Sequence, residues 1–426
     1  MLTFVKDETE KYIYELAIKK AIYVYGKKLP DIVAKRFEDE MTYIKNKDYS
    51  SSFMLAYMIT KYAHENGQFT SSRGSIGSSL IAFLLGITNV KPLPPHYYCK
   101  KCGHTNFSFV DAVYSGFDLT LRKCPICQKE LGVDGHNIPI EAFTLLNCDK
   151  PFKIDLCFPI SFKENLLRFL KDNIGKEYIV ENGCFNIDIH FPNDAHSKVN
   201  VLGFVPLEVL SRLCKRTGIS PNDIAINNSE VYELFVNSCS IGLDSNEPAT
   251  YGIPEFSTDF VREILKTTKP KNFGDLIRIT NLSHGSNVWY KNAEDLITSN
   301  ICDFRLLPSS PEDIFDFLIF RGIEKTTAIN ISKSVMDGLF RKIILIQQPD
   351  IKELFMVLDI SEWYIEYFSK VRDMLPKSHS IEFTRLAVIL AWYKINYLLE
   401  FNVENFNAYY PDIDLKNFEN TNDLLY

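Results

Sequence analysis

Four cysteines are spaced in a way that could hold a metal ion. They form two pairs, Cys99-x-x-Cys102 and Cys124-x-x-Cys127, separated by a polar stretch that contains glycine. Two such CxxC knuckles about twenty residues apart have the spacing of a tetrahedral four-thiolate zinc site. Four thiolates complete the coordination of zinc, so the ion would stabilise a loop and leave no open position for catalysis. The sequence therefore predicts a structural zinc site at these four residues.

A second candidate is the pair Lys153 and Asp155 in the stretch PFKIDLCF, residues 151–158. The stretch is typical of a short strand, and alternation along a strand puts residues two apart on one face. Two carboxylates in these positions would clamp a divalent ion, whereas one carboxylate beside an ammonium group would not. The pair is therefore either an active site or one that has lost its ligands. Lys153 either replaces a metal's charge by pairing with Asp155 or extends into solvent.

The segment SRGSIGSS, residues 72–79, has the composition of an anion-binding turn. Its glycines let backbone amides approach a ligand, and it opens an apolar helix whose N-terminus favours an anion. The serine hydroxyls and Arg73 add donors that suit a phosphate. The segment does not match the GxxxxGK[ST] pattern of a P-loop, and a glycine-rich helix start without a ligand is an equally good interpretation.

The elements that would position these residues follow from hydrophobic spacing and turn signals. Helical spacing predicts three helices in residues 1–66, the third ending at Asn66-Gly67, and a further apolar helix that stops at Gly86. Residues 96–147 contain the cysteine knuckles, and short alternating segments predict strands over residues 150–204. From Pro206 onward amphipathic helices dominate, broken at prolines. We expect an α/β fold in front and a mostly helical region behind.

Composition excludes some classes of protein. The chain has no run of about 18 apolar residues, and its N-terminus turns acidic and polar at once, so we expect a cytoplasmic protein without membrane contact. The formal net charge of −7 argues against binding nucleic acid by overall electrostatics. Lysines do cluster in IKKAIYVYGKK (residues 18–28) and in KTTKPK. A solvated surface is the simpler interpretation of each cluster, and a local basic face is the alternative.

Several longer segments together resemble one protein family. They are SSRGSIGSSLIAFLLGITNVKPLPPHYYCKKCG, CPICQKELGVDGHNIPIEAF, YGIPEFSTDFVREILKTTKPKNFGDLIRITNLSHGSNVWYKNAEDLI and LPKSHSIEF. In this order they resemble the polymerase core of PolC, the C-family replicative DNA polymerase of Gram-positive bacteria (DNA polymerase III α subunit). The combination of the glycine–serine turn, the zinc knuckles and LSHGSNVW is very specific.

The resemblance implies a fold and a domain order. Residues 1–95 would form N-terminal helices and the first part of a nucleotidyltransferase-like palm, which a zinc-binding insertion at 96–147 separates from its second part at 148–205. A mostly helical fingers domain would follow at 206–426. In the family the glycine–serine turn grips the triphosphate of the incoming nucleotide, which implies this role here for Ser72, Arg73, Gly74, Ser75, Gly77 and Ser78. The matching fingers residues are Ser283, His284, Lys377 and His379.

The family also uses three aspartates to hold two magnesium ions for phosphoryl transfer. Its D-I-D-L strand falls on Lys153-Ile154-Asp155-Leu156, and the segment IDIHFPNDAHSKVNVLG puts Asn200 at the third aspartate. The ligand set thus becomes one carboxylate, one neutral amide and one cation. Magnesium prefers anionic oxygens, so the resemblance implies weakened or absent magnesium binding.

Other parts of the family pattern are not matched. The stretch between Asp155 and Asn200 is too short for the thumb and for the palm segment with a T-T-G-Q-H-P-G-G-type motif. The exonuclease, PHP and OB-fold regions and a sliding-clamp peptide are not matched either, so we expect weak grip on primer–template DNA. The family's K-A-H-A-A-A-Y reads KSHSIEF here (residues 377–383), which we expect to narrow a surface that meets DNA or nucleotide.

Three functions are consistent with these observations. The first is a catalytically inactive homologue that acts as a decoy, inhibitor or regulator of the replicative polymerase through its palm and fingers surfaces. The second is a minimal DNA-directed DNA polymerase with residual nucleotidyltransferase activity, which would use Asp155 with Asp188 or Asp149. The third is an inert remnant or a structural subunit. The expected partners are the replicative polymerase or other replisome components, with weak binding of dNTP or DNA.

Overall fold

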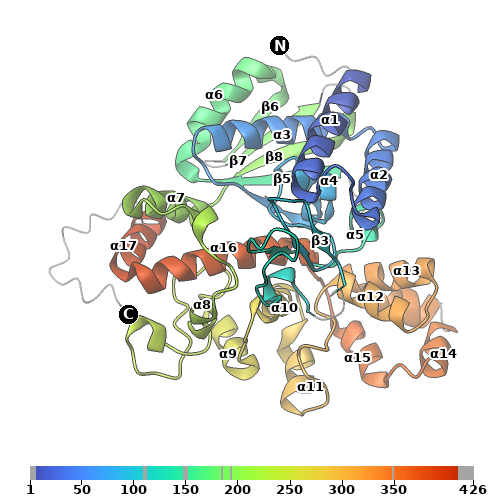
Figure 1. Ribbon diagram of the computed structural model, residues 1–426. Coiled ribbons are helices and arrows are strands. Elements are labelled where there is room, and N and C mark those ends of the chain that lie inside the picture. The colour runs from blue at the N-terminus through green and yellow to red at the C-terminus, as the bar shows by residue number, and fades with distance from the viewer. Residues whose placement is uncertain are drawn as a thin grey trace.

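Three helices open the chain and are followed by a small sheet. The structure is a computed structural model that describes residues 6–108, 113–146, 152–183, 186–191, 194–347 and 350–410. The helices are α1 (Lys6–Tyr25), α2 (Asp31–Asn46) and α3 (Ser50–Glu65), as Figure 1 shows. α3 ends at Glu65 with Asn66 as its C-cap, and Gly67 has a positive φ of 69°, which glycine adopts without strain. The three helices predicted from hydrophobic spacing are confirmed.

The central sheet has five strands in the order β1-β5-β8-β7-β6. β5 and β8 are parallel, and the other neighbouring strands are antiparallel. The strands are β1 (Ser71–Arg73), β5 (Phe152–Phe158), β6 (Ile179–Asn182), β7 (Asn186–Phe191) and β8 (Asp194–Gly203).

The connection from β5 to β8 is compact. Its described residues form η3 (Ile160–Phe162), α6 (Lys163–Asn173), η4 (Lys176–Tyr178) and the hairpin of β6 and β7. The expectation of strands throughout residues 150–204 missed α6. This helix packs on α3, where the rings of Tyr62 and Phe169 stack at 4.1 Å.

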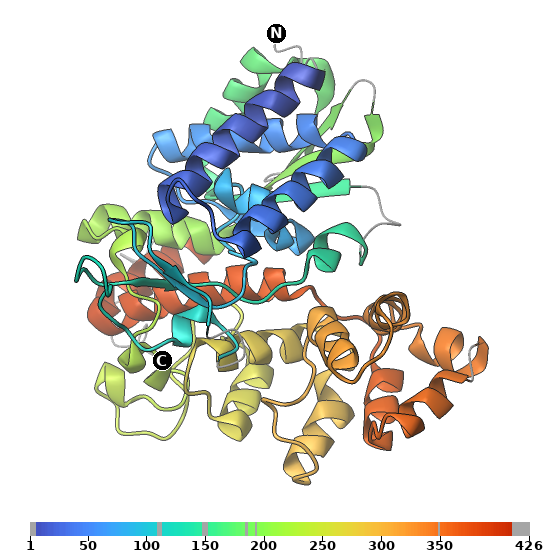
Figure 2. The same cartoon turned by 45° about the vertical axis from the view of Figure 1, so that its right-hand side comes forward.

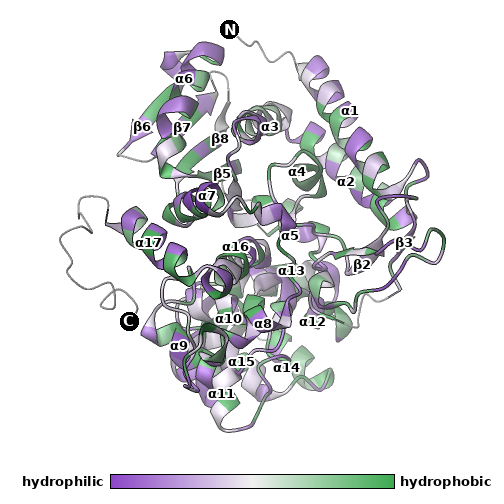
Figure 3. Cartoon of the chain, turned by 60° about the vertical axis from the view of Figure 1, so that its left-hand side comes forward, coloured by the Kyte–Doolittle hydropathy of each residue, from purple (hydrophilic) through white to green (hydrophobic). Residues whose placement is uncertain are grey.

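One face of the sheet is apolar and the other is polar. Ile154 and Leu156 of β5, together with Val199 and Val201 of β8, are buried in one core with residues of α1, α2, α3 and α6. Figure 3 shows hydrophobic and hydrophilic residues alternating along the helices that cover this side. The other face carries the polar residues of the same strands, because successive side chains of a strand point to opposite sides.

A small three-stranded sheet is formed by residues that lie between β1 and β5 in the sequence. It has the order β3-β2-β4, with β2 (His96–Tyr98) between β3 (Thr105–Asn106) and β4 (Gly132–Asp134). The segments η2 (Gly116–Asp118) and α5 (Ile140–Thr144) complete this region. In Figure 2 it lies below the C-terminal end of α1.

The rest of the described chain is helical, as expected. α16 (Lys377–Asn396) is the long helix that crosses between the two halves of the molecule in Figure 1 and packs against β1 and the turn that follows it. The searched residues contain no helix long and apolar enough to cross a membrane. The other helices of this region are α7 (Val205–Thr217), α8 (Ser229–Glu233), α9 (Asp259–Thr268), α10 (Phe273–His284), α11 (Glu294–Thr298), α12 (Pro311–Phe320), α13 (Lys325–Met336), α14 (Asp350–Val357), α15 (Glu362–Lys370) and α17 (Leu398–Tyr409).

Candidate functional site

Three residues singled out from the sequence meet on the polar face of the five-stranded sheet. Asp155 of β5 is in register with Asn200 of β8, and Lys153 lies on the same face. The Lys153 ammonium group is 2.8 Å from Asp155 Oδ2, and the Asn200 amide donates a hydrogen bond of 2.6 Å to Asp155 Oδ1. Both oxygens of this carboxylate are therefore engaged by other side chains of the chain.

Burial differs among these three residues. Asn200 is 3% exposed, and its side-chain oxygen is buried without a hydrogen-bond partner. The Asp155 side chain is 14% exposed, whereas the Lys153 side chain is 45% exposed. Lys153 therefore reaches Asp155 from the solvent side. Of the two alternatives considered for Lys153, the structure has the ion pair with Asp155 and not a side chain extended into solvent.

Asp188, the alternative ligand considered from the sequence, lies one strand further away. It pairs with Asn200 in the β7–β8 register, so it is two strand spacings, roughly 10 Å, from Asp155 in the backbone. Its carboxylate accepts a hydrogen bond of 2.6 Å from the Asn182 amide and lies 3.8 Å from the Lys198 ammonium group. Asp149, the other alternative, lies outside the described residues.

The glycine–serine turn lies directly beside this face. β1 pairs with β5 and places Arg73 opposite Asp155. The 3-10 helix η1 (Gly74–Ser78) and the short helix α4 (Leu80–Leu84) follow. Gly74 has a φ of 76° and open space on its side-chain side, so the backbone conformation, rather than crowding, requires glycine here.

The N-terminus of α4 already binds a carboxylate from within the chain. Glu40 of α2 is fully buried and accepts hydrogen bonds from Ser79 Oγ (2.7 Å), Leu80 N–H (2.9 Å) and Ile81 N–H (3.1 Å). Arg36 pairs with Glu40 and also donates a hydrogen bond to the carbonyl oxygen of Ser78. The anion that this helix N-terminus favours is therefore Glu40.

Half of the predicted phosphate-binding residues are buried where the turn packs on α16. Ser78 Oγ donates a hydrogen bond of 3.2 Å to Ser378 Oγ, and a Cβ on Gly77 would lie 3.0 Å from the Cβ of Ser378. Ser72 is 2% exposed and bonds through its hydroxyl to Thr88. The predicted residues that remain at the surface are Arg73, Gly74 and Ser75.

Glu382 of α16 holds the turn and the helix together. Its buried carboxylate accepts hydrogen bonds from Ser72 N–H (3.3 Å), the Thr88 hydroxyl (3.2 Å), and the backbone N–H and side-chain amide of Asn89 (3.1 and 2.6 Å). Burial raises the pKa of Glu382. The expectation that the segment KSHSIEF narrows a ligand surface is wrong at Ile381 and Glu382, because both side chains are buried within the protein.

The predicted fingers residues His284 and His379 lie at the edge of the same turn. His379 Nδ1 accepts a hydrogen bond of 3.3 Å from Gly74 N–H, and its ring stacks on Phe383. Burial lowers the pKa of His379 to about 4, and the charge of Arg73 acts in the same direction, so the ring is neutral. Burial also opposes the charged form of His284, but the hydrogen bond and charge of Glu255 raise its pKa overall.

The other two fingers residues make contacts within the chain. Lys377 is 3% exposed, with its ammonium group 3.5 Å from Asp313 Oδ1 and 3.9 Å from the centre of the Tyr114 ring. Ser283 Oγ donates a hydrogen bond of 3.1 Å to the carbonyl oxygen of Thr280. A nucleotide contact from either residue stays a prediction, and Lys377 would have to leave its ion pair to make one.

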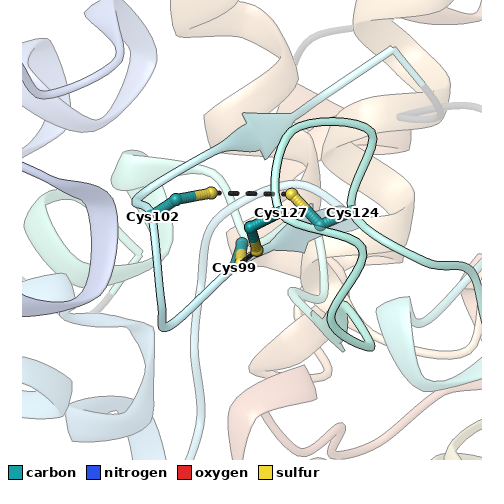
Figure 4. A group of neighbouring side chains, drawn as sticks. All are labelled: Cys99, Cys102, Cys124 and Cys127. Atoms are coloured by element: carbon teal, nitrogen blue, oxygen red, sulfur yellow. Dashed lines mark hydrogen bonds between the residues drawn. The ribbon is translucent and has the colours of Figure 1, made fainter.

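The four cysteines converge at one point, as Figure 4 shows. Their sulfur atoms all lie within 4.8 Å of one another, and the Cys99–Cys127 and Cys102–Cys124 sulfur distances are 3.4 and 3.5 Å. Tetrahedral thiolates at about 2.3 Å from a zinc ion lie roughly 3.8 Å apart, so the set fits such an ion.

The two cysteine knuckles have matching backbones. Gly103 N–H donates to the carbonyl oxygen of Cys99 at 2.9 Å, and Gln128 N–H donates to that of Cys124 at the same distance. Both residues have positive φ, 73° at Gly103 and 59° at Gln128. The knuckles pack against a small core that includes Tyr97. In the described part of the chain no other group of three or more potential metal ligands comes together.

The sequence reasoning missed Glu40, Glu382 and Glu255. Glu40 does leave a signal, because it occupies the same helical face as the buried residues Phe37, Met41 and Ile44, where an acid needs a partner. Glu382 and Glu255 bond to residues far away in sequence, and local spacing gives no indication of them.

Comparison with known proteins assigns the family. Residues 11–233 match the model of the bacterial DNA polymerase III alpha NTPase domain, and residues 206–313 match that of the bacterial DNA polymerase III alpha subunit finger domain. The chain belongs to the bacterial DNA polymerase III alpha family. Within this family member, the first match contains all five strands of the central sheet and the four cysteines.

Several similar relatives are PolC-type DNA polymerases. The chain is 30% identical to the DNA polymerase III PolC-type of Thermotoga petrophila over 93% of its own length, and 30% identical to that of Bacillus subtilis over 96%. The corresponding protein of Listeria monocytogenes is 29% identical over 97%. The chain spans about a third of the length of each relative.

The alignments with these relatives also contain insertions. The alignment with the Thermotoga petrophila protein runs over 477 positions, more than the 426 residues of this DNA polymerase III alpha family member. Residues of the relative therefore lack a counterpart within the aligned region. A missing thumb between Asp155 and Asn200 is consistent with this difference and with the compact β5–β8 connection, and its position stays a prediction.

Proposed function

We propose that this chain is a catalytically inactive homologue of the DNA polymerase III α subunit that inhibits or regulates the replicative polymerase. The observation that carries the proposal is the state of Asp155. Its two oxygens lie 2.8 Å from the Lys153 ammonium group and 2.6 Å from the Asn200 amide. Two-metal phosphoryl transfer requires carboxylate oxygens that are free to bind divalent ions.

The residues on this face do not fit a pair of magnesium ions. Magnesium takes oxygen ligands at about 2.0–2.1 Å in near-octahedral geometry. An ammonium group in contact with the ligand oxygen occupies the space of the ion and repels it. Two carboxylates, Asp155 and Asp188, stand on the face against the cations of Arg73, Lys153 and Lys198, so it lacks the anionic character that a two-metal site needs.

The part of the site that would face a nucleotide is kept better than the metal ligands. Arg73, Gly74 and Ser75 lie at the surface of the turn, beside the His284–Glu255 ion pair. Guanidinium and backbone donors of this kind suit phosphate oxygens, so weak dNTP binding belongs to the proposal. A protein that binds substrate or partner weakly and does not extend a primer would act by competition.

Primer extension by an authentic PolC-type polymerase, titrated with this protein, tests the proposal. We expect a dose-dependent loss of extension and no extension in a reaction that contains this protein alone. Repeating the titration at raised dNTP and at raised primer–template concentration identifies what the protein competes for. If nucleotide is the target, Arg73→Gln should lose inhibition, whereas Arg372→Gln, at an exposed arginine of the helical region, should not.

The other outcomes favour the other functions. Extension by this protein alone would contradict inactivity and support the minimal polymerase. No extension and no inhibition would contradict the regulatory role and support an inert remnant or a structural subunit.

We further propose zinc as the ion held by the four cysteines and the cytoplasm as the place of action, with replisome components as partners. The thiolate set and its spacing support zinc, which prefers tetrahedral sulfur ligands. Measurement of the metal content of the purified protein tests the identity of the ion.

A further inference from the structure

A groove outside the site described above has the lining of a nucleic-acid site. It has a volume of about 950 Å³ and runs between the C-terminal half of α1, the turn after α4, the three-stranded sheet and the loop at residues 222–227. None of the residues predicted to bind nucleotide or metal lines it. In Figure 2 the C-terminal end of α1 lies above the three-stranded sheet, and residues of both elements line the groove.

The charged side chains that line the groove are almost all cations. They are Lys19 and Lys20 of α1, Lys100 of the first cysteine knuckle and Arg385 of α16. Within the described residues none of the four forms an ion pair, although the chain as a whole has a net charge of −7. The one carboxylate in the lining, Asp134, is buried against the ammonium group of Lys91 at 3.0 Å. Arg385 has the carboxylate of Glu382 near it on the same helix, so the local excess of positive charge in the groove is carried chiefly by Lys19, Lys20 and Lys100.

Aromatic rings line the groove together with these cations, and the Lys20 ammonium group lies 5.5 Å from the centre of the Tyr23 ring. Tyr23 of α1 is 67% exposed, and Tyr57, Phe83 and Tyr98 are partly exposed along the groove. Lys91 lies behind two of these rings, with its ammonium group 4.2 Å from the centre of Tyr98 and 5.1 Å from that of Phe83. Exposed rings alternating with cations bind unpaired bases by stacking and phosphates by charge.

The floor of the groove continues into a second cavity of about 490 Å³, and Arg385 lines both. Asn89 and Asn222 also lie at the junction. In this cavity Ser71 is 3% exposed, and its hydroxyl group has no hydrogen-bond partner. The Glu382 carboxylate lines the same cavity and interacts with the charge of Arg385. A buried hydroxyl without a partner is suited to the polar edge of a ligand.

We propose that this groove binds a short segment of single-stranded nucleic acid. A single strand fits better than a duplex because only unpaired bases expose faces for the tyrosine and phenylalanine rings. The aromatic lining also favours a nucleic acid over an acidic peptide, which would need the cations alone. The proposal does not depend on the inactivity of the palm, because Lys153, Asp155 and Arg73 lie elsewhere.

The test uses the whole protein and a short fluorescein-labelled oligo(dT), with binding followed by fluorescence anisotropy over a range of salt concentrations. Lys19→Gln/Lys20→Gln should weaken binding about tenfold and reduce the salt slope by about 1.4, since each phosphate contact to a single strand contributes about 0.7. Lys27→Gln/Lys28→Gln removes the same charge at the end of the same basic segment, from exposed residues outside the groove, and should change neither quantity.

A second variant separates stacking from charge. Tyr23→Ala should weaken oligo(dT) binding at least about fivefold without changing the salt slope, because a stacked ring contributes to affinity independently of counterions. If Lys27→Gln/Lys28→Gln weakened oligo(dT) binding as much as Lys19→Gln/Lys20→Gln, the proposal would be overturned, since binding would then depend on charge anywhere on α1 and its end and not on the groove. Binding lost in Arg73→Gln instead would place the strand on the palm face and also overturn it.

Two competitors decide the class of ligand. Unlabelled duplex of the same length should compete more weakly than unlabelled oligo(dT), and polyglutamate should not compete. Equal competition by duplex would reduce the groove to a phosphate-binding surface, and efficient competition by polyglutamate would assign it to an acidic protein. Either result would overturn the single-strand proposal whether or not the protein inhibits a polymerase.

Discussion

Replacing Lys153 and Asn200 by aspartate should create a magnesium-dependent gain in stability that the unmodified chain lacks. The double variant puts two carboxylates beside Asp155, on adjacent parallel strands and on one face. It places three anionic groups where the resemblance to PolC implies three aspartates, without changing any residue of the apolar core. The change therefore isolates the ligand set from the fold.

The expected change in the free energy of unfolding follows from the contacts that the double variant loses and gains. The Lys153 side chain is 45% exposed, so its ion pair contributes about 0–1 kcal/mol. The Asn200 amide donates to a carboxylate in a buried position, and loss of such a hydrogen bond costs about 1.5–3 kcal/mol. With added repulsion among carboxylates, the double variant should be about 2–4 kcal/mol less stable than the parent without metal. Magnesium at about 100 times its dissociation constant should then return about 2.7 kcal/mol.

Urea denaturation followed by circular dichroism, with and without magnesium, measures both quantities. Lys171→Asp is the matched control, because it puts a carboxylate beside Glu181, which lies 3.4 Å from Lys171 and on another part of the sheet. That variant should not respond to magnesium. Equal stabilisation of the parent by magnesium would refute the reasoning, since Asp155 would then hold the ion despite Lys153. Failure of the double variant to respond would show that these two substitutions do not by themselves make a magnesium site.

Three further predictions concern other parts of the site. Glu40→Gln should lower the free energy of unfolding by about 3–5 kcal/mol, because it leaves buried donors and Arg36 without their carboxylate. Glu38→Gln, on the exposed side of the same helix, should change this free energy by less than about 0.5 kcal/mol. Urea denaturation measures both. The parent should have a larger free energy of unfolding than His284→Gln below pH about 6.5, and this difference should disappear as the pH rises through the raised pKa of His284 in the folded state. A difference that grows toward alkaline pH would contradict the ion pair with Glu255. Removal of metal by a chelator should increase hydrogen exchange in residues 96–134 while exchange in β5 and β8 stays slow; uniform unfolding would contradict a local stapling role.

Much of the fold could be predicted because its signals are local. The spacing of apolar residues located α1, α2 and α3, and the prolines located breaks in the second half. The helix α6 was not predicted, because its apolar residues Leu166, Leu167 and Leu170 cover less than three turns and lie between segments with strand alternation. The period of such a short helix cannot be separated from that of its neighbours by sequence alone.

The candidate site could be predicted only as far as its residues lie close in sequence or follow a family motif. Lys153 and Asp155 share a face because they are two apart in one strand, and the motif brought in Asn200. Spacing could not show that Ser72 and Ser78 bond within the protein, because their partners lie far along the chain: Glu382 and Ser378 are in α16. The same type of residue serves a ligand when exposed and a packed interface when buried, and burial is a property of the whole fold.

The contacts of Glu382 hold the glycine–serine turn and α16 together. Glu382 accepts four hydrogen bonds from three residues next to the glycine–serine turn, so α16 could separate from the turn only by leaving buried donors unpaired, at about 1–3 kcal/mol each. The turn and α16 are thus fixed to each other by contacts that do not involve β5 or β8. Lys153 and Asn200 lie on the polar face of the sheet, where the partly exposed Lys153 and the buried Asn200 both contact Asp155. Substitutions at these two positions should therefore change the charge around Asp155 without breaking the hydrogen bonds that hold α16 to the turn.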